Sequence, residues 1–294
     1  MGGSGSIETT SKLVLLDEKV VFLWTAPRHR QLCRLSANIK REICAYLHSP
    51  QPLVQVREDE VRYFDLGLKQ WKRLYGLQPR LPEYHMDYSL TFVDDFYLFV
   101  CGGTKSPASA HMLGPNRVLI LPDMLLGRHS HTVAYVATYK RVCVFGGCWT
   151  HTACEAYYQQ VQEWKPLPAM RTPRNGTNAV VRGDLIYLCG GDNKGTVEMY
   201  SALQDTMTLL KLTLPFSGGC VVTQWGDLVL CIAAEVSVWW NVREQRVVQK
   251  LVHPHCRVSC ICPPHVVGSQ VYVAATLECR VYSLSAGQLL CTWR

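Results

Sequence analysis

The sequence predicts an all-β propeller of four-stranded blades, and three observations lead to that prediction. Two apolar runs end in the glycine pairs Gly146-Gly147 and Gly190-Gly191, and a third pair, Gly102-Gly103, lies upstream. Successive pairs are 44 residues apart. A repeat of about 40 to 50 residues with four short strands is typical of propeller blades. The composition agrees, because 48% hydrophobic and 18% charged residues suit a large β core and exclude a disordered chain.

The best-defined unit predicts its four strands in order. Thr132–Val136 and Arg141–Phe145 are short β-branched or aromatic runs joined by a tight polar link, which is typical of a hairpin. The glycine pair at 146 and 147 then ends the second strand, because glycine tolerates the positive φ of a sharp turn. A third strand is expected around 156–158 and a fourth around 163–165.

This unit also carries an ordered set of marker residues. They are Gly146, Gly147, Tyr157, Trp164 and Met170, with Pro-Leu-Pro-x-Met-Arg as the link to the next strand. The order of a glycine pair, a Tyr and then a Trp seven residues later resembles the kelch repeat. The resemblance implies a kelch-type propeller, in which such units close into a ring.

The other units keep the period but lose some markers. Met207 stands where the repeat has Trp, and Ala233-Ala234 and Ala274-Ala275 replace two glycine pairs at intervals of 43 and 41 residues. Residues 43–294 therefore form about six units. We expect a closed kelch-type β-propeller with four antiparallel strands per blade, and six blades are preferred over seven. Closure matters because an open ring would leave two unpaired sheet edges.

The units follow one another without a linker, which predicts one domain over residues 7–294. Residues 1–6, MGGSGS, resemble an artificial linker. Residues 7–42 lack the repeat markers, so they form either closing strands for the last blade or a degenerate blade. Because the sequence shows neither a signal peptide nor a membrane-spanning apolar run, we expect a cytoplasmic protein, with the nucleus as the alternative location.

Fourteen cysteines need an explanation. Cys101, Cys143, Cys189 and Cys231 lie in or next to predicted core strands, where a thiol behaves as a small hydrophobic side chain. We therefore expect free thiols rather than a disulfide framework. A cluster of potential zinc ligands, His253, His255, Cys256 and Cys260, is followed by Cys262 and His265. Its spacing favours core cysteines and loop histidines over a metal site, so no metal and no cofactor are predicted.

The sequence contains no catalytic signature. It has no G-x-S-x-G elbow, no phosphate-binding G-x-x-x-x-G-K-[ST] loop and no H-E-x-x-H. Some kelch-type propellers are oxidases with a copper site built from Tyr, Cys and His. A propeller enzyme or metal-binding protein that uses the central channel is therefore the alternative to a non-catalytic binding module.

The excess of basic residues points to a binding face. Lys and Arg number 30 against 23 Asp and Glu, and basic or His residues precede three innermost strands, at 128–131, 171–175 and 255–257. The loops that lead into innermost strands meet on one face of a propeller, so these residues would form a cationic ring. The isoelectric point near 8.7 is too modest for a nucleic-acid binder, and no membrane partner is expected.

The kelch resemblance implies protein recognition. Similar propellers act as substrate-binding domains, often beside BTB and BACK domains that dock to a cullin ubiquitin ligase, and they hold a short and frequently acidic peptide. This chain shows no BTB or BACK pattern, so a ligase link would depend on domains absent from it. We expect Arg128 and Arg174 to pair with carboxylates of the partner. The full set of predicted partner-binding residues is His85, Arg128, His129, His131, Trp149, Arg174, Asn175, Ser217 and Arg257.

Overall fold

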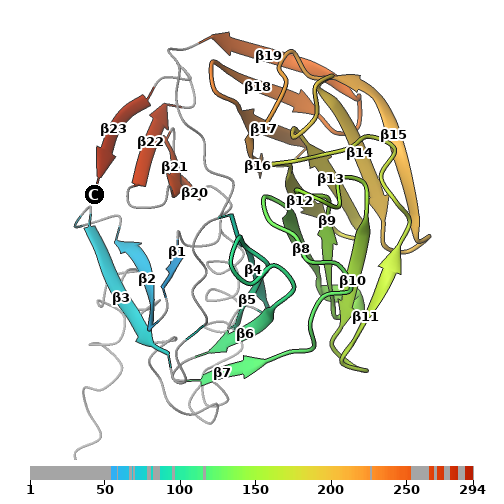
Figure 1. Cartoon of the computed structure of the whole chain (residues 1–294). Helices are drawn as coiled ribbons and strands as arrows, with labels where there is room; N and C mark the ends of the chain where they lie inside the picture. The colour runs from blue at the N-terminus through green and yellow to red at the C-terminus, as the bar shows by residue number, and fades with distance from the viewer. Residues whose placement is uncertain are drawn as a thin grey trace, which may run out of the picture.

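The computed structural model describes residues 54–252, with short gaps at 58, 66–67, 69, 78–80, 82–86, 95–96, 115–116 and 226, and four strands between 265 and 293. These residues form antiparallel sheets arranged around a common axis, as Figure 1 shows. The protein is a β-propeller, and the predicted all-β fold is confirmed. The only helical element of the described residues is the short 3₁₀ turn η1 (Ala137–Tyr139), and none of them forms a helix that could cross a membrane.

Five sheets are four-stranded blades whose strands follow chain order from the axis outward. The first blade contains β4 (Ser89–Val93), β5 (Tyr97–Cys101), β6 (Ala110–Gly114) and β7 (Arg117–Ile120). The second contains β8 (Thr132–Val136), β9 (Arg141–Phe145), β10 (Cys154–Tyr158) and β11 (Glu163–Leu167). The third contains β12 (Asn178–Arg182), β13 (Leu185–Cys189), β14 (Thr196–Ser201) and β15 (Thr206–Thr213). The fourth contains β16 (Val221–Trp225), β17 (Leu228–Ile232), β18 (Val236–Asn241) and β19 (Arg246–Val252). The fifth contains β20 (His265–Val267), β21 (Gln270–Ala274), β22 (Cys279–Ser283) and β23 (Leu289–Trp293).

The expected count of six four-stranded blades is wrong for the described residues. The remaining sheet has three strands, β1 (Val54–Val56), β2 (Glu60–Asp65) and β3 (Gln70–Gly76). Phe64 pairs with Trp71 across β2 and β3, as Tyr157 pairs with Trp164 in the second blade. This sheet therefore has the second, third and fourth strands of a blade, and no described strand occupies its innermost position. Residues 7–42, which were expected to add strands, lie outside the described part of the chain.

Aromatic side chains join neighbouring blades in a repeated way. The second strand of one blade places a ring against the third strand of the next, in the pairs Phe99–Tyr157, Phe145–Tyr200 and Tyr187–Trp240. The ring centroids are 6.1, 5.7 and 5.7 Å apart. The Tyr position of the sequence repeat is therefore an inter-blade contact, which explains why an aromatic residue recurs there.

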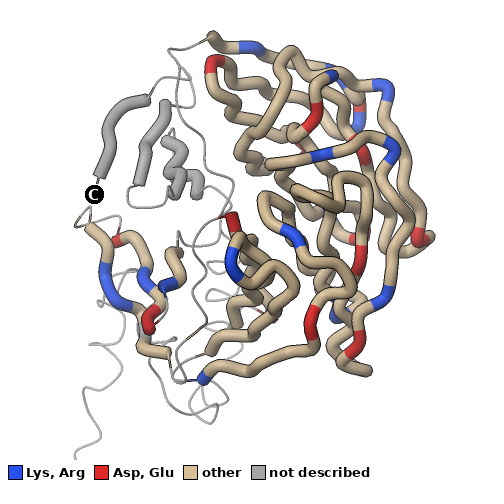
Figure 2. Tube along the Cα trace, viewed as in Figure 1, with Lys and Arg blue, Asp and Glu red and all other residues tan. Residues whose placement is uncertain are grey.

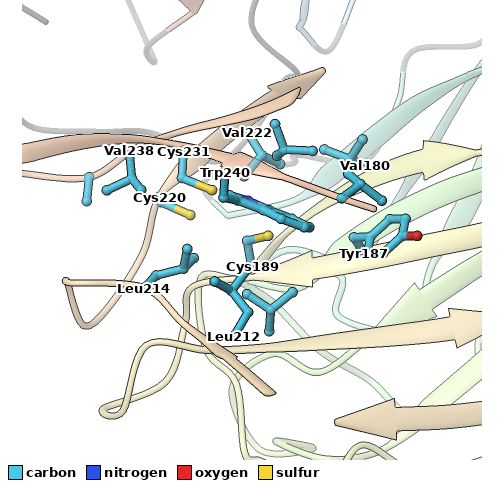
Figure 3. Packing of buried hydrophobic residues seen from close by; sticks show 14 of the residues in the cluster. Val180, Tyr187, Cys189, Leu212, Leu214, Cys220, Val222, Cys231, Val238 and Trp240 are labelled. Carbon is cyan, nitrogen blue, oxygen red and sulfur yellow. The ribbon is translucent and has the colours of Figure 1, made fainter. Parts of the chain in front are cut away.

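Most cysteines between residues 54 and 252 are part of this core. The seven cysteines of this range are free thiols, and six of them are buried. Figure 3 shows Cys189, Cys220 and Cys231 beside Trp240 in the core between the third and fourth blades. Burial raises the pKa of the Cys143 thiol to about 12, so this thiol is neutral near physiological pH and behaves as an apolar side chain.

The glycine pairs adopt the predicted backbone conformation. Gly146 and Gly147 have φ of 63° and 102°, and they end β9 where the chain leaves the sheet. In the fourth blade the chain needs only three residues between β17 and β18, and Ala233 N–H closes that loop on the Val236 carbonyl. The shorter loop has no positive φ at Ala233 or Ala234, which explains why alanines can replace the glycines there.

We predict that Gly147→Val lowers the free energy of unfolding by about 1–3 kcal/mol. A Cβ at Gly147 would lie 2.6 Å from the His129 backbone oxygen, in addition to the strain of a positive φ. Gly183→Ala is the matched control, because Gly183 has φ of 58° but nothing within 4 Å of its Cβ position. Chemical denaturation of both variants measures the difference. An equal loss in the two variants would show that the close approach at Gly147 is unimportant.

Candidate functional site

Two kinds of loop lie on one face of the propeller. Because successive strands are antiparallel, the entry loops, which lead into the innermost strands, and the glycine loops, which follow the second strands, lie on the same side. We call this side the entry face. Backbone hydrogen bonds join its loops: Ser130 N–H donates to the Asp87 carbonyl at 2.8 Å, and Gly176 N–H donates to the Ser130 carbonyl at 2.7 Å. The expected meeting of entry loops on one face is confirmed for these blades.

Arg128 lies inside the second blade rather than on its surface. Its side chain is fully buried and forms an ion pair with Glu155, whose side chain is 2% exposed. The guanidinium also donates to the carbonyls of Gly146 at 2.9 Å and Ala153 at 3.0 Å. Glu155 in turn accepts the Leu125 backbone N–H at 2.7 Å. This arginine–glutamate lock holds the entry loop, the glycine loop and β10 together.

The third blade repeats the same lock. Arg174 and Glu198 are both 0% exposed, and Nε of Arg174 lies 3.2 Å from the carboxylate. Arg174 donates to the Gly190 carbonyl at 2.8 Å, and Glu198 accepts the Arg171 N–H at 2.7 Å. Each contact has its equivalent in the second blade.

The expectation that Arg128 and Arg174 face a partner is therefore corrected. Their charges are neutralised inside the blades, so neither belongs to an accessible cationic ring. Ser217 occupies the same position before β16, and Val238 occupies the position of the glutamate on β18. The fourth blade lacks both members of the lock, as expected if the arginine is needed to neutralise the glutamate.

His131 is also buried. It is 1% exposed, and its Nε2 lies 3.3 Å from the thiol of Cys101 on the neighbouring blade. Burial first, and the nearby Arg128 second, hold the pKa of His131 well below its ordinary value. Burial raises the pKa of the Cys101 thiol. Both groups are therefore neutral, and the pair is an inter-blade contact rather than a charged thiolate–imidazolium pair.

His129 and Trp149 do reach the surface. Trp149 is 66% exposed, and its ring stands edge-on to that of His129, with the centroids 4.8 Å apart. The backbone of Trp149 has φ of 70°, which is rare for a bulky residue. His129 Nδ1 lies 3.1 Å from the Ser130 hydroxyl and 3.8 Å from the half-exposed carboxylate of Asp87.

Two exposed cations outside the predicted set of partner-binding residues lie on nearby loops. Arg171 precedes Arg174 in the entry loop of the third blade, and Lys194 is in the glycine loop of that blade. Neither side chain forms an ion pair with another described residue. Asn175 and Ser217 are exposed on the same face, as predicted. In the coloured part of the trace, acidic and basic positions are interspersed, as Figure 2 shows.

The remaining candidates lie outside the described residues. These are His85, Arg257 and the zinc candidate His253, His255, Cys256 and Cys260. Within the described part of the chain, no three His, Cys, Asp or Glu side chains gather as a metal site would need.

The partners of the two buried arginines could have been found from the sequence. Glu155 and Glu198 each precede the repeat's Tyr by two residues, so the recurring Glu-x-Tyr marks them. Comparison with known proteins adds no family assignment: no family model matches this chain, and no curated protein matches it.

Proposed function

We propose that this propeller is a kelch-type, non-catalytic binding module whose entry face holds a short acidic segment of a partner protein. The observation that supports it most is the pair of exposed cations, Arg171 and Lys194, without an acidic partner among the described residues. Several exposed cations on the opposite face are compensated instead: Arg243 Nε lies 2.9 Å from Asp227, and Lys140 Nζ lies 2.5 Å from Asp94. A carboxylate-rich segment would supply the missing charge on the entry face.

The buried locks prepare this face for binding. Glu198 accepts the backbone N–H groups of Arg171 and Thr172, so the lock holds the segment that carries the exposed cation. A loop held in its binding conformation loses little entropy when the partner arrives. In this proposal Arg174 acts as a positioning residue, and Arg171 makes the contact.

The kelch resemblance extends the proposal to a substrate receptor of a cullin ubiquitin ligase. The chain would supply substrate recognition, and the contact to the cullin would come from domains outside it. The propeller alone is then expected to bind the acidic segment.

We predict that Arg171→Ala with Lys194→Ala weakens binding of an acidic peptide by about 1–2 kcal/mol, because exposed ion pairs contribute only modestly. The probe is the tightest binder selected from a random peptide library, and calorimetric titration measures its affinity. We expect selection of Asp- and Glu-rich sequences, and weaker binding as salt is raised.

The control removes the same charge from the opposite face. Arg243→Ala with Arg246→Ala eliminates two cations with side chains 73% and 66% exposed, one in the turn between β18 and β19 and one at the start of β19. This double variant should bind as the unmodified protein does. Equal weakening by both double variants, or selection of peptides without acidic residues, would overturn the proposal.

A further inference from the structure

The loop that carries Trp149 is held on both sides by entry loops. On one side Cys148 N–H donates to the His129 carbonyl at 2.9 Å. On the other side Met170 N–H donates to the Thr152 carbonyl at 2.9 Å, and Arg174 N–H donates to the His151 carbonyl at 3.0 Å. The exposed tryptophan therefore stands between the loop of His129 and the loop of Arg171.

The backbone of this loop is strained at the residue that it exposes. Trp149 has φ of 70° and His151 has φ of 35°, whereas the equivalent Lys105 and Asn193 of the first and third blades do not have positive φ. Two hydrogen bonds within the loop stabilise this strained conformation. Thr150 donates its hydroxyl to the Gly146 carbonyl at 2.8 Å, and His151 N–H donates to the Gly147 carbonyl at 2.9 Å. Strained backbone that the surrounding structure maintains is concentrated at binding and catalytic sites.

The charged residues around Trp149 indicate which kind of group its side chain would bind. An exposed indole face attracts either a cation or an aromatic or apolar group. Arg171 on the adjoining loop and Lys194 beyond it disfavour a cationic ligand, while Asp87 lies beside His129 on the other side. An aromatic side chain has no charge to be repelled and can stack on the exposed indole face.

We propose that Trp149 and His129 form an anchor site for one aromatic side chain of the acidic segment, flanked by the carboxylates that Arg171 and Lys194 attract. This inference rests on the proposed function, and it names the residue type that the face takes besides acidic ones. Aromatic anchors surrounded by charged contacts are the usual hot spots of protein interfaces.

The test uses acidic nonapeptides that differ only at the central residue, which is Phe, Ala or Lys. Fluorescence anisotropy with the full chain should show about tenfold tighter binding of the Phe peptide than of the Ala peptide, and weaker binding of the Lys peptide. Trp149→Ala should abolish the preference for Phe while it leaves the binding of the Ala peptide unchanged. Leu203→Ala is the matched control, because Leu203 is 69% exposed at the turn between β14 and β15 on the opposite face.

The variant Trp149→Gly tests whether a lost preference for Phe comes from the missing side chain rather than from unfolding. Glycine adopts a φ of 70° without steric strain, so this variant should melt no lower than the unmodified protein and still lose the preference for Phe. If Trp149→Ala retains that preference while Arg171→Ala with Lys194→Ala weakens all peptides, the anchor proposal is overturned and the acidic-segment proposal stands. If none of the peptides binds, both proposals fail.

Discussion

Arg174→Ala is expected to lower the free energy of unfolding by about 3–5 kcal/mol, one of the two largest losses that we predict for single substitutions in this chain. The substitution leaves the buried carboxylate of Glu198 without its cation and the Gly190 carbonyl without its donor at 2.8 Å. An uncompensated charge in a desolvated site costs far more than an exposed one. Urea denaturation measures the loss.

Arg171→Ala is the matched control for this prediction. It removes an exposed arginine from the same loop and should change the free energy of unfolding by less than about 0.5 kcal/mol. The comparison separates the two arginines of this loop: Arg174, expected from the sequence to bind a partner, is predicted to stabilise the fold, and the proposed contact falls to Arg171. Equal stability of the two variants would contradict the buried lock.

A double substitution tests whether the pair acts as a unit. Arg174→Ser with Glu198→Val reproduces the residues that the fourth blade has at these positions, Ser217 and Val238. Because it removes the Glu198 carboxylate together with its cation, it should be less destabilising than Arg174→Ala alone, although the buried Asp192, 3.8 Å from Arg174, also loses this cation. The recovery is partial, since the backbone N–H groups of Arg171 and Thr172 lose their carboxylate acceptor. A double variant less stable than both single variants would show that the two side chains act independently.

Trp164→Ala is expected to destabilise the protein by about 3–5 kcal/mol, as a large deletion from a packed core. The Trp164 ring is 6.1 Å from that of Phe99 on the first blade and 5.4 Å from that of Tyr157 on its own blade. Its indole N–H donates to the Pro122 carbonyl at 2.8 Å in the link between the two blades. These contacts place Trp164 between two adjacent blades.

Trp149→Ala provides the control for Trp164→Ala. Because Trp149 is 66% exposed, its truncation should cost less than about 1 kcal/mol. Thermal and urea denaturation of the two variants give the comparison directly. A greater loss at Trp149 would mean that the loop after the glycine pair, and not the outermost strand, packs between the blades.

The strands and their order could be predicted from the sequence because the signals are local. The expected strands 132–136 and 141–145 coincide with β8 and β9, and Gly146 and Gly147 end the second strand with positive φ as the repeat pattern requires. Alternation of apolar residues and the conformational freedom of glycine act within a few residues of the chain. The positions of Tyr157 and Trp164 could also be predicted from the sequence. Their spacing of seven residues places them opposite each other on the two strands of one hairpin.

The roles of the charged residues were decided only by the tertiary structure. Whether an arginine of an entry loop is exposed or forms a buried ion pair depends on the residue that the third strand places opposite it. For Arg128 and Arg174 that residue is a glutamate 27 and 24 residues further along the chain. The exposure of Trp149 likewise depends on two entry loops from neighbouring blades. Burial and charge compensation arise from contacts between distant segments, so the sequence alone identified the loops of the candidate site, and the packing of the blades determined which of their side chains reach the solvent.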